Sequence, residues 1–172
     1  MGKTEHSKDE NRTPQNNPTP DDIYRKIADD TPVIIWTTQP DGTCSYLNKK
    51  WQEYTGQDSR HGLQFGWLDM VHYDDVEKAR DIFLEANQQQ TSFSLEYRLK
   101  DNRETYRWHL DSGNPRWDEN GEYLGFIGTV IDIHERKRAE ESLRASENYY
   151  KKYAEAMPQM AFIADGVGNI LF

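Results

Sequence analysis

Cysteine is nearly absent from this sequence, because its 172 residues include only Cys44. A single thiol excludes an intrachain disulfide and a metal cluster built from cysteines, as is typical of a protein in a reducing compartment. Long apolar runs are missing too, since no stretch approaches the roughly 18 residues of a membrane-spanning helix. There is no signal peptide, and His6 occupies the position where a myristoylation motif needs Ser or Thr. We therefore expect a cytoplasmic protein with no membrane segment in this chain.

Positive charge is also scarce: 21 Lys and Arg residues face 30 Asp and Glu residues, so the formal net charge is -9. Binding to phosphate backbones requires a basic face, so nucleic acid is not an expected partner. The sequence lacks a Gly-rich phosphate loop, a recognisable nucleophile motif and a pair of histidines at i,i+4. It therefore predicts no catalytic residue and no metal site, and we expect no enzymatic activity from this chain alone.

Apolar residues are unevenly distributed along the chain. Residues 1–21 contain several Pro and Asn but almost no apolar side chain, a composition typical of a disordered tail. Residues 22–133 have enough aromatic and β-branched residues for one domain with a normal core. Residues 134–157 are predicted to form a linker helix, and residues 158–172 belong to a separate unit.

Within residues 22–133, the pattern predicts helices and strands in a definite order. A helix over 22–29, capped by its Asp residues, precedes a hairpin of strands 33–38 and 43–47 that turns at Asp41-Gly42. Asn48 should cap a helix over 49–55, which Gly56 should end, and a capping-box pattern at 74–77 should open a helix to about Ala86. Three strands follow, at 93–99, 106–110 and 123–133. The predicted fold class is α+β, with a five-stranded, mainly antiparallel sheet and helices on one face.

Alternation predicts which strand residues face the core. In the strand from Phe93, the inward set is Phe93, Leu95, Tyr97 and Leu99. In the next strand, Tyr106, Trp108 and Leu110 are predicted inward, with Arg107, His109 and Asp111 outward, and Gly113 and Pro115 should end or bulge the strand. In the closing strand, Gly125 and Gly128 mark places for the close approach of another backbone or a ligand.

The closing strand is expected to run directly into the last helix without a loop. Asp132 followed by Glu135 resembles a capping box, so the helix should start where the strand ends. Apolar or small residues then recur in steps of four and three, the spacing of a coiled-coil seam: Ala139, Leu143, Ser146, Tyr150, Tyr153 and Met157. Two interpretations stay open, a coiled coil supported by dimerising domains and a solvated helix packed on its own domain.

The chain also contains a weak internal repeat. At an offset of 126 residues, 24–46 aligns with 150–172 without a gap and with five identities, among them Pro32 with Pro158 and Gly42 with Gly168. The order of helix, proline, strand, turn and strand recurs, which predicts that 158–172 starts a truncated second domain. The alternative is a chance match between two short segments.

The assembled pattern resembles a PAS domain followed by its C-terminal PAC motif, which here covers about 93–138. The resemblance spans residues 23–138 and is carried by Asp41-Gly42, Tyr46-Leu47-Asn48, Trp51, Tyr54-Thr55-Gly56, Val71-His72, Asp74-Asp75, Glu96-Tyr97-Arg98-Leu99, Tyr106-Arg107-Trp108, Gly125-Phe126-Ile127-Gly128, Asp132-Ile133 and Glu135-Arg136-Lys137. It implies a longer bacterial signalling protein of the sensor histidine kinase or diguanylate cyclase type. It also implies that Asp132 and Arg136 tie the sheet to the helix, whereas the simpler alternative is an exposed ion pair.

The resemblance bears on cofactors as well. Flavin-cysteine photochemistry would need an Asn-Cys-Arg motif on a helix, but Cys44 lies on a predicted strand. Haem would need a His on the helix over 76–86, which has none. His72 fits a capping role better than a ligand role, and His61 and His134 are isolated. The cofactor therefore stays unknown, with haem and flavin-cysteine chemistry disfavoured.

Five aromatic residues are candidates to line a ligand pocket, although they would equally serve to fill the core: Trp36, Tyr46, Trp51, Trp67 and Trp108. We expect a sensory and relay module that forms a homodimer and passes a change through Asp132, Ile133 and Arg136 into the helix. A small-molecule ligand and an output domain in the same longer chain would be its partners. The alternative is a ligand-free dimerisation scaffold.

Overall fold

The structure is a computed structural model and describes residues 19–156, 163–164 and 170–171. Most of the predicted tail lies outside these residues, but helix α1 begins within it, at Pro20. The elements are α1 (Pro20–Asp29), β1 (Ile34–Thr38), β2 (Cys44–Leu47), α2 (Lys49–Thr55), α3 (Ser59–Gly62), the 3-10 helix η1 (Gly66–Met70), α4 (Val76–Gln89), β3 (Phe93–Lys100), β4 (Tyr106–Trp117), β5 (Tyr123–Asp132), α5 (His134–Ala156), β6 (Ile163–Ala164) and β7 (Ile170–Leu171).

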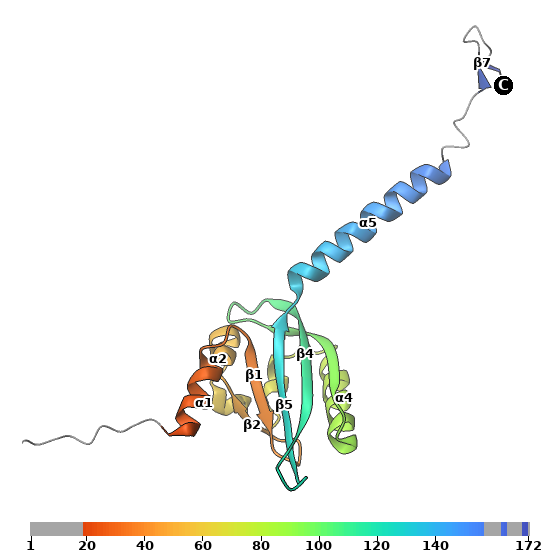
Figure 1. The fold of residues 1–172 in the computed structure, drawn as a ribbon. Coiled ribbons are helices and arrows are strands. Elements are labelled where there is room, and N and C mark those ends of the chain that lie inside the picture. Colours follow the sequence, from red (N-terminus) through yellow and green to blue (C-terminus); the bar gives the residue numbers. More distant parts are fainter. Residues whose placement is uncertain (1–18, 157–162, 165–169, 172) are drawn as a thin grey trace, which may run out of the picture.

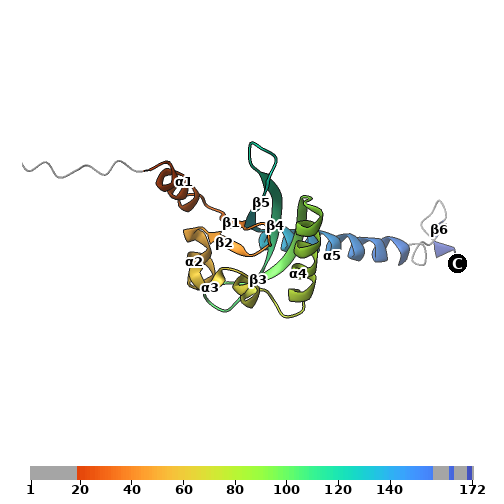
Figure 2. The same ribbon diagram turned by 90° about the horizontal axis from the view of Figure 1, so that it is seen from below.

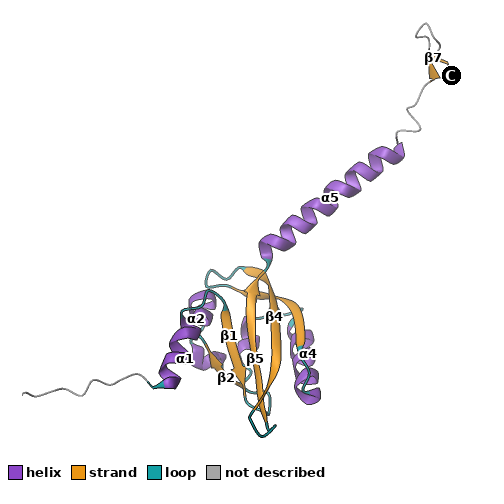
Figure 3. Cartoon of the chain, viewed as in Figure 1, coloured by secondary structure: helices purple, strands orange, loops and turns teal. Residues whose placement is uncertain are grey.

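Strands β1 to β5 form one sheet in the order β2-β1-β5-β4-β3. All four neighbouring pairs are antiparallel. Helices α2, α3 and α4 lie together on one side of this sheet (Figure 2), and α1 contacts α2 at the β2 side (Figures 1 and 3). The predicted α+β class, with helices gathered on one face of a five-stranded sheet, is confirmed.

The core lies between the sheet and these helices. Strand β3 follows the predicted alternation, because Leu95, Tyr97 and Leu99 are buried while the residues between them are partly exposed. Trp51 of α2 and Phe126 of β5, a strand of the same sheet, are almost fully buried as well. Burial of large side chains of this kind contributes about 1.5–3 kcal/mol each relative to exposure.

Strand β4 has the opposite phase to the one predicted. His109 and Asp111 face the core, with 1% and 5% of their surface exposed, whereas Trp108 lies on the outer face of the sheet. The register explains this, since His109 pairs with the inward Tyr97 and directly opposed residues share a face. The prediction failed because polar partners inside the core, described below, outweigh the apolar pattern of Tyr106, Trp108 and Leu110.

Strand β4 also continues through Gly113 and Pro115, which were predicted to end or bulge it, as far as Trp117. The neighbouring strand β3 begins at Phe93, opposite Gly113, so Pro115 has β5 on one side only. Proline is tolerated there because no donor is needed on the open side. The irregularity falls two residues later, between Arg116 and Trp117.

The helix ends show which predicted caps form. Gly56 ends α2 in the left-handed conformation with φ 74°, as predicted. The N-cap of α1 is Thr19, and Asp22 takes part through a capping box in which its carboxylate accepts from the Thr19 amide at 3.0 Å. The Asp75 side chain makes no cap hydrogen bond to α4, which extends to Gln89, beyond its predicted end. Its carboxylate binds Arg98 instead.

Three glycines of the sheet accommodate close approaches. A Cβ on Gly128 would lie 2.2 Å from the ring of Trp36, and one on Gly113 would lie 2.8 Å from it. The Trp36 indole therefore lies flat over two strands at positions without side chains. Gly125, with φ 91°, meets the backbone of Thr38 and Gln39. The predicted close approaches at Gly125 and Gly128 thus involve a backbone and a side chain.

Helix α5 follows β5 after one residue and extends away from the sheet (Figure 1). The predicted seam is exposed to solvent at Leu143, Tyr150 and Tyr153, so the helix is not packed along its own domain. Met157 lies outside the described residues. Among the described residues, no helix is both long enough and apolar enough to cross a bilayer.

Candidate functional site

A small cavity lies inside the core between the sheet and α2, η1 and α4. Its volume is about 30 Å³, enough for about two water-sized groups. The half-buried rings of Trp67 and Phe93 form part of its wall, and most other wall residues are buried. The lining residues are Trp36, Thr38, Cys44, Leu47, Trp51, Trp67, Phe83, Phe93, Leu95, Tyr97, Asp111 and Val130.

Asp111 is the charged member of this lining. Its Oδ1 accepts a hydrogen bond from the indole Nε1 of Trp36 at 2.8 Å, and its Oδ2 accepts one from the hydroxyl of Tyr97 at 3.2 Å. Burial raises the pKa of Asp111 to about 7, although both hydrogen bonds act in the opposite direction. The core therefore holds a carboxyl group that titrates near neutral pH.

The structure separates the five aromatic residues proposed to line a pocket. Trp36, Trp51 and Trp67 lie at the cavity, and the positions of Tyr46 and Trp108 do not agree with the prediction. The Tyr46 hydroxyl donates to Asp29 at 3.2 Å, away from the core. Trp108 lies on the outer sheet face because β4 has the opposite phase to the predicted one.

The described side chains do not fit a haem or a flavin-cysteine adduct. A cavity of about 30 Å³ is about tenfold smaller than the smallest typical cofactor pockets. Helix α4 carries no histidine, and Cys44 is buried on β2, where burial raises the pKa of its thiol to about 11. Within the described part of the chain, no group of three His, Cys, Asp or Glu side chains is placed to hold a metal ion.

Two histidines lie outside the cavity lining. His109, predicted to point outward, is buried with its ring against Tyr54, and burial lowers its pKa. Its Nδ1 lies 2.9 Å from the carbonyl oxygen of Arg107. His72 has a local role: its Nδ1 lies 3.3 Å from the amide nitrogen of Asp74, as expected for a capping residue.

The second part of the candidate site is the junction between β5 and α5. The Oδ2 of Asp132 accepts from Arg107 Nε at 2.7 Å, and its Oδ1 accepts from the His134 amide at 2.8 Å. Burial opposes ionisation of Asp132, but the hydrogen bonds from Arg107 and His134 outweigh it and lower its pKa. Between them, Ile133 is buried and donates its N–H to the Trp108 carbonyl at 2.9 Å.

Arg136 does not pair with Asp132, which corrects the expected pair. Its guanidinium reaches Glu96 of β3 at 2.8 Å and Glu140 at 3.1 Å. Lys137 forms a second ion pair with Glu96. Arg107 of β4 also contacts Glu135 of α5 at 3.4 Å. The start of α5 is therefore bound to β3 through Glu96 and to β4 through Arg107, a wider attachment than the predicted one.

Trp108 has two cations close to its ring on the outer face of the sheet. The Nζ of Lys137 is 5.4 Å from its ring centre, and the Cζ of Arg98 is 5.5 Å from it. Arg98 in turn donates to Asp75 at the start of α4, through Nε at 2.8 Å and Nη2 at 2.9 Å. These contacts link α4, the β3 edge, Trp108 and α5 in sequence.

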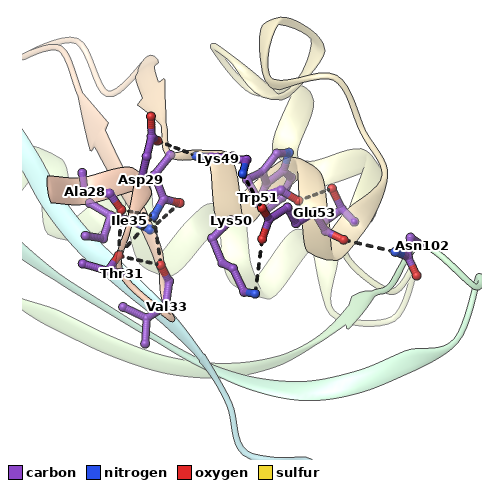
Figure 4. Close-up of polar contacts among 12 residues, drawn as sticks. Ala28, Asp29, Thr31, Val33, Ile35, Lys49, Lys50, Trp51, Glu53 and Asn102 are labelled. Atoms are coloured by element: carbon purple, nitrogen blue, oxygen red, sulfur yellow. Dashed lines mark hydrogen bonds and ion pairs between the residues drawn. The ribbon is translucent and has the colours of Figure 1, made fainter. Parts of the chain in front are cut away.

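Asn48 has a role that differs from its predicted cap. It is fully buried, and its Nδ2 donates to the carbonyls of Ala28 at 2.8 Å and Val33 at 3.0 Å, while its Oδ1 accepts from the Ile35 amide at 3.0 Å. Asp29 instead accepts from the amide of Lys49 at the start of α2 (Figure 4). These bonds connect α1, β1 and α2.

A PAS fold family model matches residues 45–130, which is half of the chain. An uncharacterised protein of Sinorhizobium fredii, y4lL, is 40% identical over 118 residues, covering 69% of this chain and 14% of its own length. The peroxide stress-activated histidine kinase mak1 of Schizosaccharomyces pombe is 29% identical over 157 residues, which are 87% of this chain and 10% of the relative. The chain thus spans a small part of these relatives.

The fold is also similar to a solved structure. The N-terminal domain of a diguanylate cyclase with PAS/PAC sensor from Marinobacter aquaeolei superposes with a TM-score of 0.54 and 19% identity. That match covers 61% of this chain and 98% of the other. Together with the matched family model and the sheet order, these similarities establish that the chain belongs to the PAS fold family.

Proposed function

We propose that this chain is a PAS sensory and relay module of a longer signalling protein, which passes a change in the core through the β5–α5 junction into helix α5. The observation that carries the proposal is the junction itself: one residue separates the strand from the helix, and Asp132 contacts both. With no loop between them, a shift of β5 moves the start of α5.

The longer protein in this proposal carries its output domain beyond the chain, as a histidine kinase or a diguanylate cyclase in the cytoplasm. One relative is named as a histidine kinase and one similar structure as part of a diguanylate cyclase. The short hairpin beyond α5 supports a second PAS unit. The pairing of Ala164 with Ile170 reproduces that of Thr38 with Cys44 at the same offset of 126 residues.

The proposed module works as a homodimer through α5, because the exposed seam needs a partner to form a coiled coil. Cysteine cross-linking tests this part. Leu143→Cys on the seam should form a disulfide between chains under mild oxidation, whereas Glu141→Cys, which faces away from the seam, should not. Equal cross-linking of both variants would exclude the seam as the interface.

The relay itself is tested by output. In a chimera with a histidine kinase catalytic region fused after Ala156 in heptad register, Asp132→Ala should change the autophosphorylation rate, and the exposed control Glu141→Ala should not. An unchanged rate in a folded Asp132→Ala chimera would exclude this junction as the route.

A ligand-free dimerisation scaffold is the second candidate, and the small cavity favours it. A space of about 30 Å³ is below the 300 Å³ or more of typical ligand pockets. The absorption spectrum and the mass spectrum of freshly purified native protein distinguish the two. A bound molecule or bands beyond the aromatic region support a cofactor sensor and count against the scaffold.

A further inference from the structure

The cavity combines one buried carboxyl group with aromatic walls. Among its lining residues, Asp111 alone carries a formal charge, and only 5% of its surface is exposed. Its two hydrogen-bond donors, the Trp36 indole and the Tyr97 hydroxyl, are both neutral. They orient the carboxyl group but leave its negative charge uncompensated.

An uncompensated buried carboxylate costs several kcal/mol, which proteins avoid by adding a proton or a cation. The elements around Asp111 supply no cation to the cavity. The titratable groups that face it are the Cys44 thiol of β2 and the Tyr97 phenol of β3, while the lining residues of β1, α2, η1, α4 and β5 do not titrate. His109 lies two residues before Asp111 on β4. Burial lowers the pKa of His109, which favours its neutral form over a cation that could compensate Asp111.

The aromatic side chains of the cavity lining are of the kind that binds cations. Trp36, Trp51, Trp67 and Tyr97 line the same space as the carboxyl group, and aromatic faces attract ammonium groups, most strongly where water is excluded. The volume of about 30 Å³ limits an occupant to about two non-hydrogen atoms. A carboxylate among aromatic rings within a space of this size matches a very small amine.

We propose that this cavity binds a small protonated amine, of the size of ammonium or methylammonium, with the Asp111 carboxylate as its counter-ion and the aromatic rings as its walls. The inference rests on the proposed function, because it names the ligand class of the same sensory module. The competing occupant of the carboxyl group is a proton.

Competition with the proton makes the proposal testable. Burial raises the pKa of Asp111 to about 7, so much of the empty site is protonated in neutral solution. An amine cation must displace that proton, so its apparent affinity should rise with pH below the pKa and level off above it. Below the pKa, the rise is about tenfold per pH unit.

The experiment is a titration of the full chain with methylammonium chloride, followed by calorimetry and by the fluorescence of the tryptophans. Sodium chloride keeps the ionic strength constant, and tetramethylammonium chloride serves as a cation too large for the cavity. We expect saturable binding that is about tenfold tighter at pH 8 than at pH 6, because the deprotonated fraction of a group with a pKa of about 7 rises by that factor. Asp111→Asn should weaken it by about tenfold or more, because the variant has no counter-ion.

Three outcomes would overturn the proposal: no saturable binding, the same response to tetramethylammonium, or an affinity independent of pH. If Asp111→Asn fails to fold, the effects of pH and of cation size on binding to the native chain still test the proposal. The two proposals can fail separately. If methylammonium does not bind but the output of the kinase chimera still depends on Asp132, the amine site is rejected and the relay function is retained.

Discussion

The guanidinium Nε of Arg107 lies 2.7 Å from Oδ2 of Asp132, so strand β4 binds the last residue of β5 immediately before α5 begins. The other carboxylate oxygen of Asp132 accepts from the amide of His134. A single side chain thus joins two central strands to the first turn of the helix. This relationship is the physical basis of the proposed relay.

Replacing Asp132 by Ala should loosen the first turn of α5. The variant loses both hydrogen bonds and leaves Arg107 with only its longer contact to Glu135, at a cost of about 1–2 kcal/mol in the free energy of unfolding, since the pair is partly exposed. Amide hydrogen exchange should accelerate over residues 134–140. The control Glu140→Ala removes an exposed i,i+4 ion pair with Arg136, and should cost only about 0.3 kcal/mol. Equal exchange in both variants would show that Asp132 does not hold the helix.

Replacing Trp108 by Leu should release α5 from the outer face of the sheet. The ring loses its contacts with Lys137 and Arg98, each of which contributes about 0.5–1 kcal/mol at a partly exposed site. Hydrogen exchange of residues 134–140 should again rise, while that of β1 stays unchanged. Trp117→Leu, an exposed tryptophan at the other end of β4, is the matched control. If both substitutions affect α5 alike, the cation contacts of Trp108 have no specific role.

Replacing Gly128 by Ala should displace the Trp36 ring, because a Cβ there would lie 2.2 Å from it. Overpacking of this kind costs about 1–3 kcal/mol, and the loss of the indole bond to Asp111 would add to that cost. Urea denaturation measures the change. The control Gly121→Ala has free space around its Cβ and only the cost of a positive φ, about 1 kcal/mol. A smaller loss at Gly128 than at Gly121 would contradict this packing.

The ionisation of Asp111 should make stability depend on pH. Its folded pKa of about 7 exceeds the usual value near 3.8, so the folded state holds the proton more tightly. Its contribution is therefore fully present below about pH 4 and is lost as pH rises to about 7, by up to about 4 kcal/mol. Asp111→Asn has no carboxyl group at this position and should not lose this stability as the pH rises. The unfolding free energy of the variant, relative to that of the native protein, should therefore increase with pH. If the unfolding free energies of the native protein and of Asp111→Asn change in parallel between pH 5 and 8, Asp111 does not titrate in that range.

The order of elements could be predicted because local signals agreed with the fold. Leu95, Tyr97 and Leu99 alternate cleanly on β3, and Gly56 ends α2 at a position that requires a left-handed residue. Turn chemistry and period-two alternation act over a few residues, so a single sequence reveals them. The direct passage from β5 to α5 was predictable for the same reason.

The side chains of the site were less predictable because distant partners decide them. Asp111 looks like an outward residue of β4 until Trp36 and Tyr97 are brought to it by the sheet and its register. Asn48 and Asp75 were expected to cap helices, but their side chains bind segments far along the chain. No local pattern distinguishes such uses from ordinary caps.

The proposed relay requires that the core and α5 are coupled through Asp132, which a double-mutant cycle followed by hydrogen exchange tests. Phe83 of α4 is buried in the core, where its ring contacts Trp36 and Phe126. Phe83→Leu perturbs this packing without touching α5. Exchange is measured over residues 134–140 in the native chain, both single variants and the double variant, with residues 49–55 as a reference for global unfolding.

If the core and α5 are coupled through Asp132, Phe83→Leu should accelerate exchange over residues 134–140 in the native background and have no further effect in Asp132→Ala, a non-additive result. Equal effects of Phe83→Leu in both backgrounds, or no effect in the native chain, would show that Asp132 does not couple the core to α5.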